Sequence, residues 1–568
     1  MLINSVRKRR CDAQKPSCSH CIELDVECHY DDTPSQRIDA SGGSREILDR
    51  LRNIETLVQK QSECITALSS AQIHSLSDEP TPQSQHLPPA VDTQPQIWSS
   101  SRPGVSPDLS NLPPLTIPVK HKTSSTYLLT LPSVRALIGD YPTDLFFRFE
   151  LRSCHSPLFS LETCLLPTTS VNIQREIADH LVSAFFSVVH PNHPILDPKD
   201  FENCYERFLE MGPDHSPEST LCMVVLALGA VATATPDLEA FKTSPPGMEY
   251  IQYSMSTLIS FSAWSLPSSM VVTHALVLAS VYFAYIVRPL QSWRLIHSAS
   301  TVLQINRVGI DLPQTLPSDI NDAEHLARLF WSCFLVECDR LAELELPRSG
   351  LEELTDNIYL PSCTNLGVTE STHYLAEISI RRLLNRIHNS LYPGKKHPLS
   401  QPAITSLISD DFSMEEVASL DAVCNELRSQ LETWYSSIPE DFRPNLEDTA
   451  TESPASRQTI LKIRYFAARH IIYRPFLLCI VTHGSNRAPQ SMVEKAGLCI
   501  ESCRCSLGAI IILTLASLNR DLQDLVPDIE ELQTMAIDNF RPWAFSSLEV
   551  VVSILEDIRK KCRLLVQV

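Results

Sequence analysis

Apolar residues recur at helical spacing through most of the chain from Ser133 onward, with Pro, Asn and Ser between the periodic segments. This pattern predicts amphipathic helices that bury one face against a shared core. The clearest predicted stripe consists of Ile177, Leu181, Val182, Phe185, Phe186 and Val189. The last predicted helix, over 546–568, opens with a capping box formed by Ser546 and Glu549. We therefore expect a mainly α fold whose largest part is an all-α domain over residues 133–568.

A second periodic segment spans residues 44–70, directly after Gly42 and Gly43. Its apolar side chains repeat every three or four residues, which is typical of the seam of a coiled coil. The seam positions are Ile47, Leu51, Ile54, Val58, Gln61, Ile65 and Leu68, of which Gln61 is the one polar member. Two interpretations stand: a short parallel coiled coil that joins two chains in a homodimer, or a single amphipathic helix that packs on the body.

Two stretches lack any such periodicity. Residues 33–43 are a short polar linker, and residues 71–132 are rich in Pro, Ser, Gln and Thr with few apolar clusters. A segment of this composition cannot bury enough apolar surface to fold, so we predict a disordered linker over 71–132.

One stretch, Met270–Val287, is apolar enough to raise the question of a membrane span. Thr273, His274 and Ser280 interrupt it, and no second stretch of that quality accompanies it. We therefore predict a helix buried in the core and no membrane partner.

The amino-acid composition narrows the range of protein classes to which this chain can belong. The chain of 568 residues has a formal net charge of −20 and only 14 glycines. So few glycines argue against nucleotide-binding α/β folds, which need glycine-rich turns. The 18 cysteines, behind an N-terminus without the pattern of a signal peptide, indicate reduced thiols in a cytosolic or nuclear protein.

The most specific chemistry lies close to the N-terminus. Four cysteines follow the pattern Cys-x(6)-Cys-x(2)-Cys-x(6)-Cys, namely Cys11, Cys18, Cys21 and Cys28. Zinc takes a tetrahedral set of thiolates, and a Cys-x(2)-Cys step brings two of them to one ion. A basic run precedes them, namely Arg7, Lys8, Arg9 and Arg10. Because basic side chains neutralise phosphates and the acidic body repels them, any contact with DNA falls to this module.

This N-terminal module, residues 1–32, resembles part of the binuclear zinc cluster of the fungal Zn(2)-C6 transcription factors. The resemblance covers the last four of the six cysteines and the basic run. It implies that two zinc ions share six thiolates in an intact cluster, with Cys18 in a bridging position. It also implies that a short helix carrying Lys8 and Arg10 reads a CGG-type triplet in the major groove of double-stranded DNA. Residues 44–70 would then pair two modules on two half-sites.

Two cysteines of that pattern are absent. Counted back from Cys11, they would stand at the positions of Met1 and Asn4. The four thiolates present can serve at most one zinc ion. Three interpretations stand: an upstream exon encodes the missing Cys-x(2)-Cys pair, the cluster has degenerated and no longer binds DNA in this way, or the cysteines are spaced by chance.

The helical body resembles the fungal-specific transcription factor regulatory domain, most closely over about residues 175–350. Three motifs in the expected order carry the resemblance. They are the turn His-Pro-Asn-His-Pro-Ile-Leu-Asp at 190–197, the segment Ser-Trp-Arg-Leu-Ile-His-Ser-Ala at 292–299, and the stretch 328–348, which begins Arg-Leu-Phe-Trp and contains Asp339-Arg340. The resemblance implies a body that regulates the DNA-bound module through co-regulators or a small-molecule effector.

These features predict a nuclear regulator of transcription by RNA polymerase II, and not an enzyme. All-helical enzymes that hold magnesium and diphosphate need Asp-Asp-x-x-Asp motifs. The nearest match, Asp410-Asp411 followed by Glu415, is one residue too long, and the chain has no Gly-x-Ser-x-Gly, His-Glu-x-x-His or Walker-type motif. A third class stays open: a regulator that does not bind DNA and acts through dimerisation or through binding of a ligand or partner.

Overall fold

The structure is a computed structural model of the chain, which divides into two units, residues 1–43 and 44–568. All described residues belong to the second unit. They are 123–142, 144–153, 171–234, 244–264, 270–310, 320–344, 346–355, 358–363, 366–392, 420–447, 457–482, 488–503, 507–543 and 547–566.

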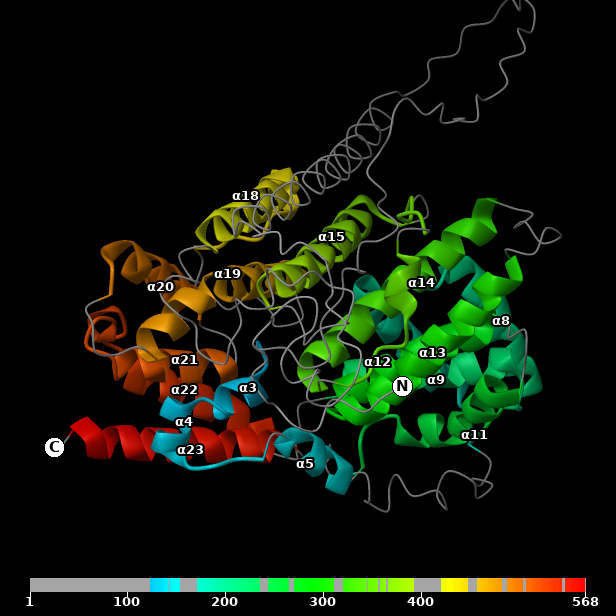
Figure 1. The fold of residues 1–568 in the computed structure, drawn as a ribbon. Coiled ribbons are helices and arrows are strands. Elements are labelled where there is room, and N and C mark those ends of the chain that lie inside the picture. Colours follow the sequence, from blue (N-terminus) through cyan, green and yellow to red (C-terminus); the bar gives the residue numbers. More distant parts are fainter. Residues whose placement is uncertain are drawn as a thin grey trace, which may run out of the picture. The chain divides into compact units, whose positions relative to one another are not determined.

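Within these ranges the secondary structure is helical throughout, which confirms the predicted mainly α fold (Figure 1). The α-helices are α3 (Ser125–Leu129), α4 (Pro132–Ile138), α5 (Leu145–Ser153), α7 (Arg175–Ala184), α8 (Pro198–Met211), α9 (Pro217–Thr233), α11 (Met248–Trp264), α12 (Met270–Tyr285), α13 (Pro289–Ile310), α14 (Ile320–Leu344), α15 (Val368–Leu391), α18 (Asp421–Ser437), α19 (Arg457–Thr482), α20 (Gln490–Ser502), α21 (Leu507–Ser517), α22 (Ile529–Phe540) and α23 (Ser547–Val566).

A first apolar core forms around α9 and α12, with α7, α8, α11, α13 and α14 packed about them. Both central helices are apolar on all sides and buried along most of their length, as expected of helices without a solvent face. The start of α9 shows why the chain turns helical there: the Ser216 hydroxyl accepts a hydrogen bond from the Ser219 amide, and Pro217 occupies the first helical position.

A second apolar core forms from both ends of the described body. Helices α18 to α23 supply most of it, and α3 and α4 pack against α21 and α23. Figure 1 shows this closure, with the cyan α4 and α5 beside the red α23. The described helices therefore begin at Ser125, inside the stretch 71–132 predicted as a disordered linker. Leu128 and Leu129 are buried there, because they fill the second core.

One helix belongs to both cores. The N-terminal half of α15 places Tyr374, Leu375 and Ile378 in the first core. Ala376 and the buried apolar side chains from Ile380 to Leu391 lie in the second. The position of α15 relative to α14 and α19 therefore determines how the two cores meet.

Three sequence predictions can be compared directly with these elements. Helix α12 is buried as predicted for Met270–Val287, and no described helix has the length and apolarity needed to cross a bilayer. In the predicted stripe of 177–189, Ile177 is 49% exposed, so its assignment to the core was wrong. Ala178 takes the inward position instead, one turn before Leu181. Helix α23 forms as predicted, although Ser546 of the expected capping box lies outside the described residues.

The close packing of α7 on α9 depends on Gly229. A Cβ atom at this position would stand 2.1 Å from the carbonyl oxygen of Leu181, a backbone atom that cannot rotate away. We therefore expect Gly229→Ala to lower the free energy of unfolding by about 1–3 kcal/mol, measured as a lower midpoint in urea.

The matched control is Gly497→Ala on α20, where an added Cβ meets its nearest atom, Cδ1 of Leu525, at 3.8 Å. Alanine is the better helix former, so this variant should be unchanged or more stable by up to about 1 kcal/mol. Equal midpoints for Gly229→Ala and the unaltered protein would contradict the close approach of α7 and α9.

Candidate functional site

The first motif forms a tight turn whose polar groups bond to one another. Helix α7 continues into a π-helical turn at Phe185–Val189 and a 3₁₀ turn at His190–Asn192. The buried His190 then donates from Nε2 to the carbonyl oxygen of Leu196, 2.9 Å away. Burial lowers the pKa of His190, so the ring is neutral at physiological pH. Its hydrogen bond to Leu196 stabilises the turn. This result supports a structural role for the turn histidines.

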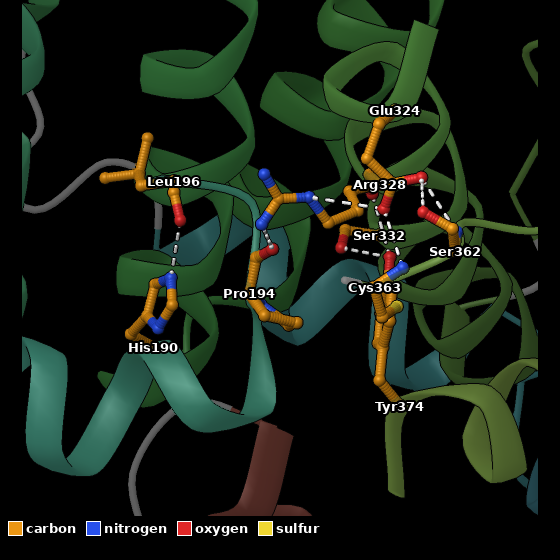
Figure 2. A network of polar contacts seen from close by, with 9 residues as sticks. All are labelled: His190, Pro194, Leu196, Glu324, Arg328, Ser332, Ser362, Cys363 and Tyr374. Atoms are coloured by element: carbon orange, nitrogen blue, oxygen red, sulfur yellow. Dashed lines mark hydrogen bonds and ion pairs between the residues drawn. The ribbon is translucent and has the colours of Figure 1, made fainter. Parts of the chain in front are cut away.

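The third motif reaches this turn through Arg328, which is 1% exposed. Its Nη1 donates to the carbonyl oxygen of Pro194 over 3.3 Å, and its Nε lies 3.9 Å from a carboxylate oxygen of Glu324. Figure 2 shows the guanidinium between the turn on one side and the carboxylate on the other. The first and third motifs, far apart in sequence, therefore meet in the interior.

Two further side chains, Tyr374 and Glu324, hold α14 in this position through hydrogen bonds. The Tyr374 hydroxyl on α15 donates to the Arg328 carbonyl oxygen at 2.8 Å and lies 2.8 Å from the Ser332 hydroxyl. Glu324 accepts the backbone amides of Ser362 at 2.7 Å and Cys363 at 2.8 Å (Figure 2). Cys363 adopts φ of 54°, a left-handed conformation that is costly for a residue other than glycine.

The second motif contacts the end of the third. Trp293 on α13 donates from its indole nitrogen to the carbonyl oxygen of Pro347, 3.3 Å away. The third motif also contains the buried Glu337, whose carboxylate accepts hydrogen bonds from the Ser349 amide at 2.8 Å and from the Ser349 hydroxyl at 2.9 Å. Burial raises the pKa of Glu337, although the two bonds from Ser349 oppose this rise. The first and second motifs therefore both contact the third.

A cluster of charged side chains lies where α14, α15 and α19 come together. Asp339 of the third motif forms an ion pair with Arg381 on α15. It also accepts two parallel hydrogen bonds from Arg464 on α19, at 2.6 and 2.7 Å. Arg464 in turn lies 3.3 Å from Glu377 on α15. We call these four residues, Asp339, Glu377, Arg381 and Arg464, the charged junction.

The pKa values show how strongly these groups act on one another. Burial on its own raises the pKa of Asp339, but the charges of Arg381 and Arg464 outweigh it and hold that pKa well below its usual range. His193 of the first motif lies within reach of this field. Burial lowers the pKa of His193 to about 4, with the charge of Asp339 opposing the shift. At physiological pH, Asp339 of the junction is therefore ionised and the nearby His193 is neutral.

The arrangement gives these groups a positioning role. Each polar group named above is directed at a neighbouring helix or turn, so that they fix how three helices cross. Trp331 of the third motif is a core residue: it is fully buried, and its indole nitrogen donates to the Tyr359 carbonyl oxygen at 2.9 Å.

The residues predicted to bind zinc and DNA lie outside the described residues, and so do those of the heptad seam. They are Cys11, Cys18, Cys21 and Cys28, Arg7, Lys8, Arg9 and Arg10, and Ile47, Leu51, Ile54, Val58, Ile65 and Leu68. Their roles stay predictions.

The partners of Asp339 were missed by reasoning from sequence. The motif singled out Asp339 and its neighbour Arg340, whereas its ion pairs run to Arg381 and Arg464 on other helices. A helical stripe that contains Glu377 and Arg381, at spacing i and i+4, was the one available signal.

Comparison with known proteins finds two family matches along the chain. The model of the fungal-specific transcription factor domain matches residues 182–436, which include all three motifs and the three junction residues on α14 and α15. The model of the fungal Zn(2)-Cys(6) binuclear cluster domain matches residues 5–37, which include all four N-terminal cysteines.

Curated relatives match over most of the chain at low identity. The transcriptional activator protein acu-15 of Neurospora crassa is 21% identical over 86% of this chain and 52% of its own length. The putative transcription factor ecdB of Aspergillus rugulosus is 24% identical over 87% and 81%, respectively. The nitrogen assimilation transcription factor nirA of Emericella nidulans is 23% identical over 87% and 56%. The chain thus spans about half the length of the first and last of these relatives. No solved structure matches it.

The charged junction leads to a test by substitution. Asp339→Asn keeps the shape of the side chain but removes the carboxylate that Arg381 and Arg464 share, so that Glu377 is the one carboxylate left in the charged junction. We expect the free energy of unfolding at pH 7 to fall by about 3 kcal/mol. Because the folded-state pKa of Asp339 is depressed, its contribution is present above the unfolded pKa of about 4 and is lost as the pH falls further.

The difference between the two proteins should therefore be constant from pH 7 to pH 5 and shrink below about pH 4. Unfolding by urea at each pH measures it. Glu206→Gln, which removes the partner of Arg175 in a surface ion pair of 2.6 Å, is the control and should have little effect. A difference that grows on acidification would contradict the assigned ionisation of Asp339.

Proposed function

We infer that this chain, which belongs to the fungal Zn(2)-Cys(6) transcription factor family, is a nuclear regulator that binds DNA through its N-terminal module and is regulated through its helical body. The observation that carries this inference is the order of the two family matches. A zinc-cluster match with its basic run comes first, and a regulatory-domain match follows on the same chain. Each of the three relatives named above is a transcription factor or activator by name, which supports a role other than catalysis.

The DNA contact that we propose is carried by the basic run. Lys8 and Arg10 would reach the guanines of a CGG-type site in the major groove, where Arg and Lys pair with guanine O6 and N7. The remaining basic residues would contact phosphates. A net charge of −20 over the chain supports this division, because the body cannot approach DNA on its own.

Zinc would supply the folding energy of the N-terminal module, since so small a unit has no apolar core of its own. Cys11, Cys18, Cys21 and Cys28 would hold it. With Met1 and Asn4 at the positions of two further cysteines, this set fits at most one ion. Pairing of two chains along residues 44–70 would place two modules on two half-sites, and would explain why the heptad seam follows the module after a short linker.

A second function is favoured by the same two positions. If four thiolates do not fold the module, the chain acts as a regulator that does not bind DNA. It would then pair with related chains through residues 44–70, and the helical body would bind its co-regulator or effector.

A gel-shift experiment separates the two. A variant that carries Cys at positions 1 and 4, behind an added initiating Met, should bind a CGG-containing duplex in a zinc-dependent way. In this background Lys8→Ala should weaken specific binding by roughly tenfold, because one base contact is worth about 1–3 kcal/mol. Lys199→Ala, an exposed basic residue on α8, is the control and should leave affinity unchanged.

The unaltered chain is measured beside it. Zinc-dependent preference for the CGG duplex in the unaltered chain supports the first function. Its absence in the unaltered chain supports the second, whether or not the variant with six cysteines binds. Equal affinity of the Lys8→Ala and Lys199→Ala variants would refute the role assigned to Lys8.

A further inference from the structure

Two thiols and an imidazole converge between α19 and α20, away from the charged junction. His470 lies on α19, Cys499 lies on α20, and Cys503 is the residue that caps the C-terminus of α20. The Nδ1 atom of His470 is 2.6 Å from Sγ of Cys503 and 3.8 Å from Sγ of Cys499. All three potential ligand atoms lie within 4.8 Å of one another.

The packing of the two helices builds this cluster. Helices α19 and α20 lie side by side along their length (Figure 1). Cys499 and Cys503 stand one helical turn apart and therefore face α19 together. Cys499 is fully buried and Cys503 is 1% exposed, whereas His470 is partly buried as a residue.

The other buried cysteines in the part of the chain that the structure describes do not share this arrangement. Cys424 on α18, for example, donates its thiol to the Ile472 carbonyl oxygen at 3.4 Å, as an ordinary core thiol does. Cys499 also lies near a carbonyl oxygen, that of His470 at 3.6 Å, but it has the imidazole and a second thiol beside it. The convergence of two thiols and one imidazole distinguishes this cluster from those thiols.

The geometry suits a metal ion of small radius. Bond lengths of about 2.3 Å to sulfur and about 2.1 Å to nitrogen, at a tetrahedral angle, separate the two ligand atoms by about 3.6 Å. The distance from His470 to Cys499 already has this value within a few tenths of an ångström. The distance from His470 to Cys503 would need to open by about 1 Å, which a small rotation of the partly buried imidazole can supply.

A buried positive charge stands beside the cluster. Arg474, one turn beyond His470 on α19, is 1% exposed and lies close enough to Cys499 and Cys503 for their charges to act on it. Its Nη1 donates to the Thr123 carbonyl oxygen at 2.7 Å, and its Nε and Nη2 are buried without a hydrogen-bond partner among the described residues. This guanidinium favours the thiolate forms of both cysteines, which are the forms that bind metal.

We propose that His470, Cys499 and Cys503 form a binding site for a thiophilic metal ion, zinc or copper(I), in the regulatory body. Two thiolates, one imidazole and an open fourth position are a ligand set that zinc accepts, and soft thiolates also select copper(I). The two thiolates and Arg474 together carry one negative charge, so a monovalent ion would leave the site neutral and a divalent ion would leave it with one positive charge.

This site is distinct from the zinc cluster assigned to the N-terminal module and does not depend on it. Because α19 also carries Arg464, an ion held between α19 and α20 would act on a helix that belongs to the charged junction. A metal ion bound between α19 and α20 would therefore affect how α19 packs in the helical body.

The test measures metal content in the full chain. The unaltered protein, a variant with Cys499→Ser and Cys503→Ser, and the control Cys424→Ser are loaded anaerobically with zinc or with copper(I), freed of loose metal and analysed by mass spectrometry. The N-terminal cysteines are present in all three, so their contribution cancels. We expect one more ion per chain, with at least one of the two metals, in the unaltered protein and the control than in the double variant.

A second variant distinguishes loss of metal binding from loss of the fold. His470→Ala removes a partly buried ligand and keeps both core thiols, so its fold should persist, as circular dichroism without metal can check. Metal should raise the thermal midpoint of the unaltered protein, and this rise should be lost in His470→Ala. Equal content of both metals in the unaltered protein and the double variant, or an equal rise in the His470→Ala protein, would overturn the proposal whatever the fate of the DNA-binding role.

Discussion

The pairing of Asp339 with two arginines is the interaction on which the rest of the helical body depends. Hydrophobic burial is non-directional, so hydrogen-bonded charge pairs add the direction that helps to align two apolar cores. Asp339 on α14 binds Arg381 on α15 and, through two parallel bonds, Arg464 on α19. Charges so placed are costly unless fully partnered, so the cluster contributes little net stability but strongly favours one crossing geometry. The charged junction thus selects how the cores meet.

This geometry explains the structural role of the three motifs, which is to hold α14 against its neighbours. The turn at 190–197 is clamped by His190 and held to α14 by Arg328, and the end of the third motif is held to α13 by Trp293. His193 brings the same turn under the field of Asp339. These residues build the scaffold that fixes α14, and none of them needs a ligand to explain its place.

The sequence predicted the class of fold well and the junction poorly. Helical periodicity identifies α7 and α23, and an unbroken apolar stretch identifies α12, because each of these patterns is carried by consecutive residues. It failed at Ile177, where a neighbouring residue faces the core, and at Leu128 and Leu129, where a few apolar residues in a polar stretch pack against helices distant in sequence. The partners Arg381 and Arg464, and the grouping of His470 with Cys499, depend on contacts between helices, which periodicity along one helix does not record.

The coupling between Asp339 and Arg464 tests the central claim most directly. A double-mutant cycle with Asp339→Asn, Arg464→Met and the combined variant, each unfolded in urea at pH 7, isolates the energy of that pair. If the two side chains act as one unit across α14 and α19, the effects are not additive, and the coupling energy lies at about 1–3 kcal/mol. Additive effects, with a coupling energy near zero, would show that the two cores are aligned without the charged junction and would contradict this account.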